Sequence, residues 1–554
     1  MEVHVGGAHW TQSGPAYVSG SAFLDGDLLD ERALADRVAA TEDADELARL
    51  LSRANGFFSL IHRRDDAISL AVDHVRSWPL FYAVTDDVYV SDSAEWVHET
   101  GARRGFDPVA GTEYLCTGFV PGRATLSRDV SQVRAGEIVT LAGDGASVSR
   151  DRYFNHRPDE SSTPVDPDAF EAVLREAVGR LIEYADGRTV LLGLSDGYDS
   201  RLIALLLHQL GYDDVVAYTS QTADRRPEVL EVGESIARDL GFEHVRITTN
   251  DADYDHIDNS AEMDLVSDVG YLAEYPSVNK VVQRRKMAAA GIDPSEVVHV
   301  LGHQLLGAGT FLPDWIRERD VLDRETLGDL LWRLHYSHWE LPGDSEWRRL
   351  LESRMLEHLP SGLYERGDVE PTPEAVSGFE QWYWQERLPK YIIIRQEYAH
   401  LGFDVWYPLL DRALFSFFEQ SHHHDRVGKR ILKETARRLD GEIRGTPSDL
   451  APAGSSQSRS LREAAWDRLV DLVHALPDPA SEYVRDRYYA YTERDVYDRD
   501  PRYNIVSEAE FDGMALPTGN EGDLHRTILL LYLYRQGYFE FPTETEFDRV
   551  LADT

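Results

Sequence analysis

The chain has 554 residues, of which 42% are hydrophobic and 10% aromatic, so it is long and apolar enough for two or three folded domains. A formal net charge of −41 argues against nucleic acid as a partner. It does not indicate disorder, because disordered acidic chains lack the 11 Trp and 27 Tyr residues found here. Of the 57 basic residues only five are lysines, namely Lys280, Lys286, Lys390, Lys429 and Lys433. An acidic, arginine-rich and lysine-poor surface is typical of a protein from a salt-rich cytoplasm, where salt screens the repulsion between like charges.

Cysteine and hydropathy narrow the class of protein further. The single cysteine, Cys116, excludes a disulfide framework and a cysteine zinc site, and we expect it to be a buried structural thiol. The sequence has no apolar run of eighteen residues and no basic start followed by an apolar core. These features predict a cytoplasmic protein with no membrane partner.

The first part of the chain is predicted to be rich in β-strands. Short apolar or alternating runs, separated by polar turns, occupy residues 57–62, 67–72, 80–84, 88–91 and 136–142. The polar stretch 155–168 is rich in Pro and Asp and is expected to be a linker.

The pattern changes after this linker to strands that alternate with helices. Apolar strands are predicted at 189–194, 215–220, 244–248 and 297–301, with helices at 201–210 and 228–240. Fully apolar strands that alternate with helices indicate a parallel sheet covered on both faces, the α/β doubly wound class. From about residue 315 the chain is expected to be mostly helical.

The segment LLGLSDGYDSR, residues 191–201, carries the most specific signal. A buried strand that leads through a short Ser/Gly/Asp loop into a helix offers backbone N–H groups and a helix N-terminus to a phosphate. Ser195 and Ser200 would add hydroxyl groups, Gly197 would allow close approach, and Asp199 would hold Mg²⁺. The alternative is an ordinary strand–turn–helix in which Asp199 is only a helix cap.

This loop resembles the SGGxDS pyrophosphate loop of the asparagine synthetase family. Further segments that resemble the family follow in family order: EVGESIARDLGFEHVRI (231–247), EYPSVNK (274–280), VVHVLGH (297–303), LGFDVWYPLLD (401–411) and GKRILKE (428–434). The resemblance covers about residues 190 to 435. It implies an ATP-pyrophosphatase (PP-loop) fold that binds ATP and Mg²⁺ through Ser195, Asp196, Gly197, Asp199 and Ser200, with Asp199 as the metal ligand.

The first part of the chain also resembles this family, through NGFFSLI and VDHVRSWPLFY, which are similar to its glutaminase-like domain. An active glutaminase of that class has a cysteine directly after the initiator Met, whereas here Glu2 follows Met1. Without a thiol there is no thioester chemistry. We therefore expect residues 1–160 to form a degenerate class II glutamine-amidotransferase-like domain with an α+β, Ntn-type fold. Residues 161–554 would form the synthetase domain, helical toward its C-terminal end.

Lysines give a second line of evidence for the site, since two of the five lie within GKRILK. Lys429 aligns with the catalytic lysine of the family, and Lys433 falls where the family usually has Arg. A lysine ammonium is a compact charge suited to a phosphate or a developing oxyanion. The alternative is a pair of solvent lysines.

Three positions depart from the family pattern. Asp196 replaces the second glycine of the loop, which is repulsive toward phosphate unless the carboxylate faces solvent or shares the metal. The second loop, residues 301–310, contains no acid. His303 stands where asparagine-forming members have Glu, and is either a general base for an incoming amine or a hydrogen-bonded loop residue.

The HHH run at 422–424 is not expected to hold metal, because consecutive histidines on a helix point in different directions.

Two hypotheses about the function remain. The first is an ATP-dependent ligase that adenylates a small-molecule or peptide carboxylate and forms an amide with ammonia or a substrate amine. The second is a non-catalytic binding or scaffold protein that kept the fold. Convergence of Asp199, Lys429 and His303 on one cleft, with a second carboxylate nearby, would favour the enzyme.

Overall fold

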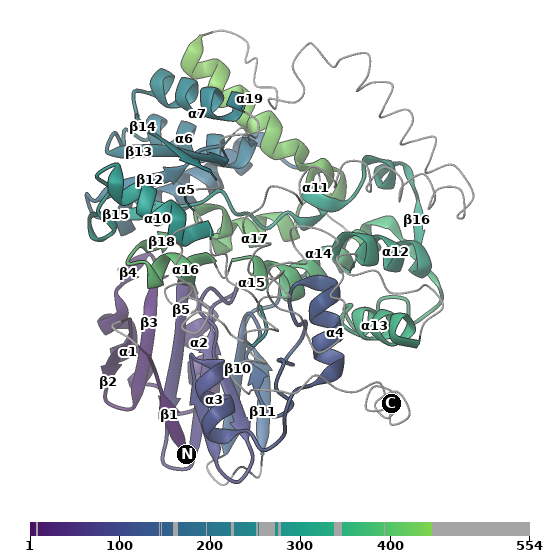
Figure 1. The fold of residues 1–554 in the computed structure, drawn as a ribbon. Coiled ribbons are helices and arrows are strands. Elements are labelled where there is room, and N and C mark those ends of the chain that lie inside the picture. Colours follow the sequence, from purple (N-terminus) through teal and green to yellow (C-terminus); the bar gives the residue numbers. More distant parts are fainter. Residues whose placement is uncertain are drawn as a thin grey trace.

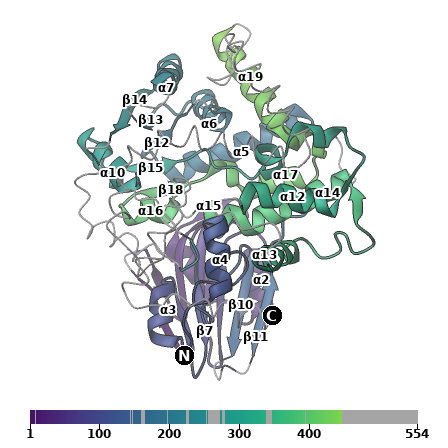
Figure 2. The same ribbon diagram turned by 45° about the vertical axis from the view of Figure 1, so that its right-hand side comes forward.

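The computed structural model shows two sets of sheets stacked one above the other (Figure 1 and Figure 2). It describes residues 1–6, 9–142, 145, 147–158, 164–195, 197–222, 227–250, 253, 272–274, 279–336, 346–392 and 394–445. The N-terminal strands, purple to blue, lie below, and the teal and green elements lie above them in both views.

Two sheets build the N-terminal part. Their strands are β1 (Glu2–His4), β2 (Thr11–Ser13), β3 (Ala16–Leu24), β4 (Asp27–Leu29), β5 (Ala54–Arg63), β6 (Ala67–Val72), β7 (Phe81–Val84), β8 (Val88–Ser91), β9 (Ser131–Gln132), β10 (Glu137–Ala142) and β11 (Val148–Arg152). The larger sheet is antiparallel with the order β11-β10-β6-β5-β3-β2, and β4 also pairs with β3. The smaller has the order β1-β8-β7-β9, with β1 parallel to β8. Strands are thus present in all five of the predicted β-regions.

These sheets and their helices form four layers. The helices are α1 (Glu31–Ala39), α2 (Ala44–Leu51), α3 (Ala94–Gly101) and α4 (Pro108–Thr117). On β6, Ile68 and Leu70 pack toward the smaller sheet, whereas Ala71 belongs to the cluster that contains the apolar faces of α1 and α2. This is the period-2 alternation of a strand buried on both faces. α3 and α4 pack on the outer face of the smaller sheet.

A five-stranded parallel sheet forms the core of the upper part. Its strands are β12 (Thr189–Gly193), β13 (Val215–Thr222), β14 (Glu243–Thr249), β15 (Val297–Val300) and β18 (Asp404–Trp406), in the order β14-β13-β12-β15-β18. The chain runs outward from β12 through β13 to β14 and then returns to the other side of β12. The carboxyl ends of β12 and β15 therefore meet at the point where the strand order reverses, which is where ligands bind in open α/β sheets.

Helices cover this sheet and extend beyond it. They are α5 (Pro167–Ala185), α6 (Tyr198–Gln209), α7 (Pro227–Leu240), α10 (Asn279–Ala289), α11 (Gly307–Phe311), α12 (Arg324–His335), α13 (Glu346–Glu357), α14 (Thr372–Trp382), α15 (Leu388–Tyr391), α16 (Ile394–His400), α17 (Arg412–Glu419), α18 (His423–Arg426) and α19 (Arg430–Arg444). Short 3₁₀ turns are η1 (Pro294–Glu296), η2 (Asp314–Glu318), η4 (Pro408–Leu410) and η5 (Val427–Lys429), and η3 (Tyr383–Arg387) is a π-helix. A two-stranded ribbon joins β16 (Val321–Asp323) to β17 (Val369–Pro371). None of the described helices has the length and apolar character needed to cross a membrane.

Buried polar contacts join the two parts of the molecule. Glu274 accepts from Arg76 at 3.0 Å and from Lys390 at 2.8 Å, and all three side chains are buried. His74 contacts the Leu410 carbonyl oxygen through Nε2 at 2.7 Å. Because buried charges are costly unless paired, this network holds the two parts in one arrangement.

Candidate active site

A pocket of about 520 Å³ opens at the carboxyl ends of β12 and β15. Three chain segments, 193–200, 301–311 and 383–391, line it together with Lys429. Six of the residues predicted from sequence are among the lining residues, namely Ser195, Gly197, Asp199, Ser200, His303 and Lys429. Asp196 lies outside the described residues. Lys433 lies half-buried on α19 and is not among the lining residues.

The loop between β12 and α6 is closed by its two serines. Ser195 donates its backbone N–H to Ser200 Oγ at 3.1 Å, the two hydroxyls are 3.1 Å apart, and Gly197 donates its N–H to Ser195 Oγ at 3.1 Å. Gly197 is the N-cap of α6 and provides no side-chain cap. The first turn of α6, with the positive end of the helix dipole, lies at the pocket, which its residues Asp199 and Ser200 line.

Asp199 is not a helix cap, because it lies inside the first turn of α6 and its side chain turns toward the pocket. Its Oδ2 accepts from Lys429 Nζ at 2.7 Å, although 230 residues separate the two. Lys429 has a left-handed backbone with φ of 55°, next to Gly428 with φ of 72°. A non-glycine residue in this region is uncommon and costs free energy, and such residues gather at functional sites.

The remaining oxygen of Asp199 fits a metal ligand. Asp199 Oδ1 is buried and accepts no hydrogen bond within the described structure. Mg²⁺ is commonly held by one or two carboxylates together with substrate phosphates. Asp199 is the only carboxylate among the described residues that line the pocket, so the second carboxylate that would have favoured the enzyme is not found there.

The second loop approaches the first through glycine. A Cβ on Gly302 would lie 3.0 Å from Ser200 N and 3.4 Å from Asp199 Cβ, so only glycine leaves this amide open. Gly309 on α11 leaves room for Lys429 in the same way, since a Cβ there would lie 2.8 Å from Lys429 Cγ. His303 packs edge-on against Tyr391, with ring centroids 4.8 Å apart. Its ring lines the pocket, and both predicted roles of His303 stay open.

Tyr383, Arg387 and Tyr391 are among the lining residues that were not found from sequence. They come from the π-helix η3 and from α15, and π-helical turns occur often at functional sites. Burial raises the pKa of Tyr383, and the charge of Arg387 opposes this shift. The sequence shows this region only as rich in Trp and Tyr, which is equally typical of a core.

Met1 and Cys116 are the residues of the N-terminal part that bear on the predicted loss of glutaminase chemistry. The Met1 amine forms an ion pair with Asp87 at 2.7 Å, and Glu2 follows on β1. Cys116 is fully buried on α4, as expected for a structural thiol.

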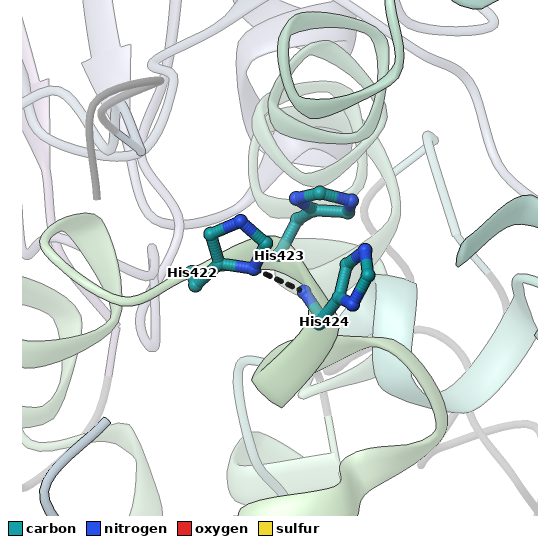
Figure 3. Close-up of side chains that lie close together, drawn as sticks. All are labelled: His422, His423 and His424. Carbon is teal, nitrogen blue, oxygen red and sulfur yellow. Dashed lines mark hydrogen bonds between the residues drawn. The ribbon is translucent and has the colours of Figure 1, made fainter. Parts of the chain in front are cut away.

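The three histidines at 422–424 lie closer together than expected (Figure 3). The expectation of diverging side chains was wrong because His422 precedes α18 as its N-cap, with Nδ1 accepting from the His424 N–H at 3.2 Å. One ring nitrogen of each histidine lies within 4.8 Å of the others. Burial is the largest cause that lowers the pKa of His422 and His423, followed by the neighbouring histidines and Arg426. We interpret the cluster as a helix cap with packed rings.

Comparisons with known proteins give distant structural likenesses only. No protein-family model and no curated protein matches the sequence. An NH3-dependent NAD synthetase from Campylobacter jejuni aligns with 36% of this chain and 90% of its own, at 18% identity and a TM-score of 0.19. NMN synthetase from Francisella tularensis aligns with 40% and 93%, at 11% identity and a TM-score of 0.20. A glutamine phosphoribosylpyrophosphate amidotransferase from B. subtilis aligns with 54% and 58%, at 13% identity and a TM-score of 0.18. With TM-scores this low, the likenesses support no conclusion about the function of this chain. The function is therefore inferred from the residues of the pocket.

Proposed function

We propose that the protein is an ATP-dependent ligase that adenylates a carboxylate, releases pyrophosphate and forms an amide, as the resemblance to asparagine synthetases implies. The observation that carries the proposal is the ion pair between Lys429 and Asp199 at the N-terminus of α6. A cation, a carboxylate with an open oxygen, and helix amides together are the groups that a nucleoside triphosphate with its metal requires.

In this proposal the phosphates lie against the amides of the loop 195–200, and Asp199 Oδ1 is the oxygen that would hold Mg²⁺. The metal would neutralise charge on the phosphates. The substrate carboxylate attacks the α-phosphate, and the bond to the β-phosphate breaks to release pyrophosphate. Lys429 stabilises the charge that develops on the phosphate oxygens during this step. An amine then displaces AMP from the acyl-adenylate.

The amine has to reach the pocket without glutamine hydrolysis by this chain. Residues 1–160 are proposed to be the degenerate glutaminase-like domain, and residues 161–554 the synthetase domain. Ammonia or an amine of the substrate itself would therefore be the nucleophile, and His303, with its ring in the pocket, is placed to accept its proton.

The test is pyrophosphate release from Mg·ATP in molar KCl, against a panel of carboxylates with and without ammonium. Release that depends on one carboxylate supports the proposal, and an amide product with AMP completes it. Calorimetric titration with Mg·ATP provides the first checkpoint, since a parent protein that binds no Mg·ATP is not this ligase.

The second candidate is a non-catalytic protein that kept the fold. One observation favours it, namely that Asp199 is the only carboxylate among the described lining residues. This candidate predicts that no carboxylate of the panel stimulates pyrophosphate release.

A further inference from the structure

Among the described lining residues of the pocket, one positive charge has no carboxylate partner. Lys429 and Arg387 are its cations, and Lys429 is neutralised by Asp199 at 2.7 Å. Arg387 forms no ion pair and donates no hydrogen bond within the described structure. Its guanidinium instead lies over two aromatic rings, 5.5 Å from the centroid of Phe119 and 5.0 Å from that of Tyr391.

This unbalanced cation is unusual in its surroundings. The chain has a net charge of −41, so acidic partners for an arginine are abundant elsewhere on it. Burial lowers the pKa of Arg387, and only Tyr383 and Tyr391 oppose that shift. A half-buried guanidinium without a carboxylate partner is stabilised when an anion binds beside it, because a charge-assisted hydrogen bond then offsets the cost of its burial.

The N-terminal part holds Arg387 in place. Phe119, which follows α4, provides one of the two rings beneath the guanidinium. The residue before Arg387, Glu386, accepts from the Gly122 N–H at 2.6 Å and forms an ion pair with Arg134. The N-terminal part thus has a structural role at the pocket, because its contacts fix the position of the η3 turn that carries Arg387.

We propose that Arg387 binds a second anionic group of the substrate, so that the acid activated in this pocket is a dianion. One carboxylate lies near Lys429 for adenylation, and the other group, a carboxylate or a phosphate ester, pairs with Arg387 between Tyr391 and Tyr383. The adenylation of the first carboxylate rests on the proposed function. The binding of a second anion rests on the geometry of Arg387 alone.

Arg387 is assigned to the substrate rather than to the nucleotide because of its neighbours. The phosphate cradle at 195–200 already has the α6 amides, Lys429 and the open oxygen of Asp199. Arg387 lies instead against Tyr391, the ring that packs on His303 of the second loop.

The experiment titrates the full chain calorimetrically in molar KCl, with Mg²⁺ and α,β-methylene-ATP, which cannot release pyrophosphate. Glutarate and adipate are compared with valerate and hexanoate, which have the same chain lengths and one carboxylate each. 3-Phosphonopropionate tests a phosphorus anion as the second group. The variants are Arg387→Gln, Arg387→Lys and the control Arg319→Gln, which removes an exposed guanidinium stacked on Trp315 outside the pocket.

We expect at least one dianion to bind about tenfold or more tightly than its monoanion. Arg387→Gln should abolish this difference, Arg387→Lys should retain part of it, and Arg319→Gln should leave it unchanged. Equal binding of dianions and monoanions by the parent overturns the inference, as does a loss of nucleotide affinity in Arg387→Gln that exceeds the loss for dianions. If the parent binds no nucleotide but still prefers dianions through Arg387, the ligase proposal fails and the anion site stands.

Discussion

Lys429 Nζ lies 2.7 Å from Asp199 Oδ2, and the two residues come from different helices that meet at one pocket. The side chains of Lys429 and Asp199 are only 18% and 21% exposed. Salt therefore screens their attraction less than it screens an ion pair on the surface. It holds the ammonium beside the loop 195–200 and leaves Asp199 Oδ1 without a hydrogen bond in the described structure, as the proposed metal site requires.

Replacing either partner should separate binding from chemistry. Asp199→Asn should weaken Mg·ATP binding, because a neutral amide is a poorer ligand for a hard cation. Lys429→Ala should leave nucleotide affinity largely intact and slow pyrophosphate release by about a hundredfold or more, as for other preorganised charge stabilisers. Lys433→Ala is the matched control and should have little effect. Calorimetry and pyrophosphate release measure the two quantities, and a Lys429→Ala protein that loses mainly nucleotide affinity would contradict this division of roles.

Gly302→Ala should close the phosphate cradle without unfolding the protein. The added methyl group would lie 3.0 Å from Ser200 N, so either the amide is covered or α6 shifts. We expect Mg·ATP affinity to fall by about tenfold, the value of one good charge-assisted hydrogen bond. The control is Gly179→Ala in α5, where nothing lies within 4 Å and the helix should gain about 0.5–1 kcal/mol. An unchanged affinity in Gly302→Ala would place the phosphates elsewhere.

The parallel sheet could be predicted from sequence because each strand is a separate apolar run. The strand predicted at 189–194 is β12, Thr189–Gly193, and the strand predicted at 297–301 is β15, Val297–Val300. The helix predicted at 201–210 begins earlier, at Tyr198, because Gly197 rather than a later residue is its N-cap. Strand existence depends on local hydrophobicity, whereas a helix boundary depends on capping contacts that composition does not show.

The anion-binding half of the pocket could not be predicted in the same way. Ser195, Asp199 and Lys429 lie in motifs, but Arg387 is one of 52 arginines and carries no local signal. Its proposed role depends on the absence of a carboxylate partner among the described residues, which the sequence does not show. It also depends on the π-helix η3, which hydrophobic periodicity does not predict. Its support by Phe119 joins segments 268 residues apart, a contact visible only once the two parts are packed together.

Glutamine should not be hydrolysed by this protein, with or without ATP. The Met1 amine is engaged by Asp87, and the only cysteine of the chain, Cys116, is fully buried. Glutamate release, measured with an enzyme-coupled assay, should equal that of a blank, and Cys116→Ala should change nothing. Turnover that disappears in Cys116→Ala would show that our interpretation of the N-terminal part is wrong.

Salt should stabilise the fold strongly. With a net charge of −41 the native state repels itself, and raising KCl to molar concentration shortens the Debye length to about 3 Å. The melting temperature, followed by circular dichroism, should rise steeply with KCl and less with sucrose, which does not screen charge. A melting temperature indifferent to KCl would contradict the adaptation to salt inferred from composition.

Acid should destabilise the protein through His74, which lies where the two parts meet. Its ring is buried among aromatic side chains, and its Nε2 donates a hydrogen bond to the Leu410 carbonyl oxygen at 2.7 Å. Burial, with a smaller effect of Arg412, lowers the pKa of His74 from 6.5 to about 3. Between these two pH values the unfolded chain binds the proton and the folded protein does not, so stability falls as pH drops from 6.5 toward 3.

His74→Gln tests this contribution, because glutamine keeps an N–H donor but does not titrate. The variant should be less stable at pH 7, where it has lost the packed ring, and its stability should fall less steeply below pH 6.5. One histidine accounts for up to about 1.4 kcal/mol per pH unit of the slope in that window. Urea unfolding in molar KCl at several pH values measures the difference, and His424→Gln, at an exposed position, is the control. Parallel stability curves for the parent and His74→Gln would mean that the pKa of His74 is the same in the folded and unfolded chains, and would contradict this explanation of the acid sensitivity.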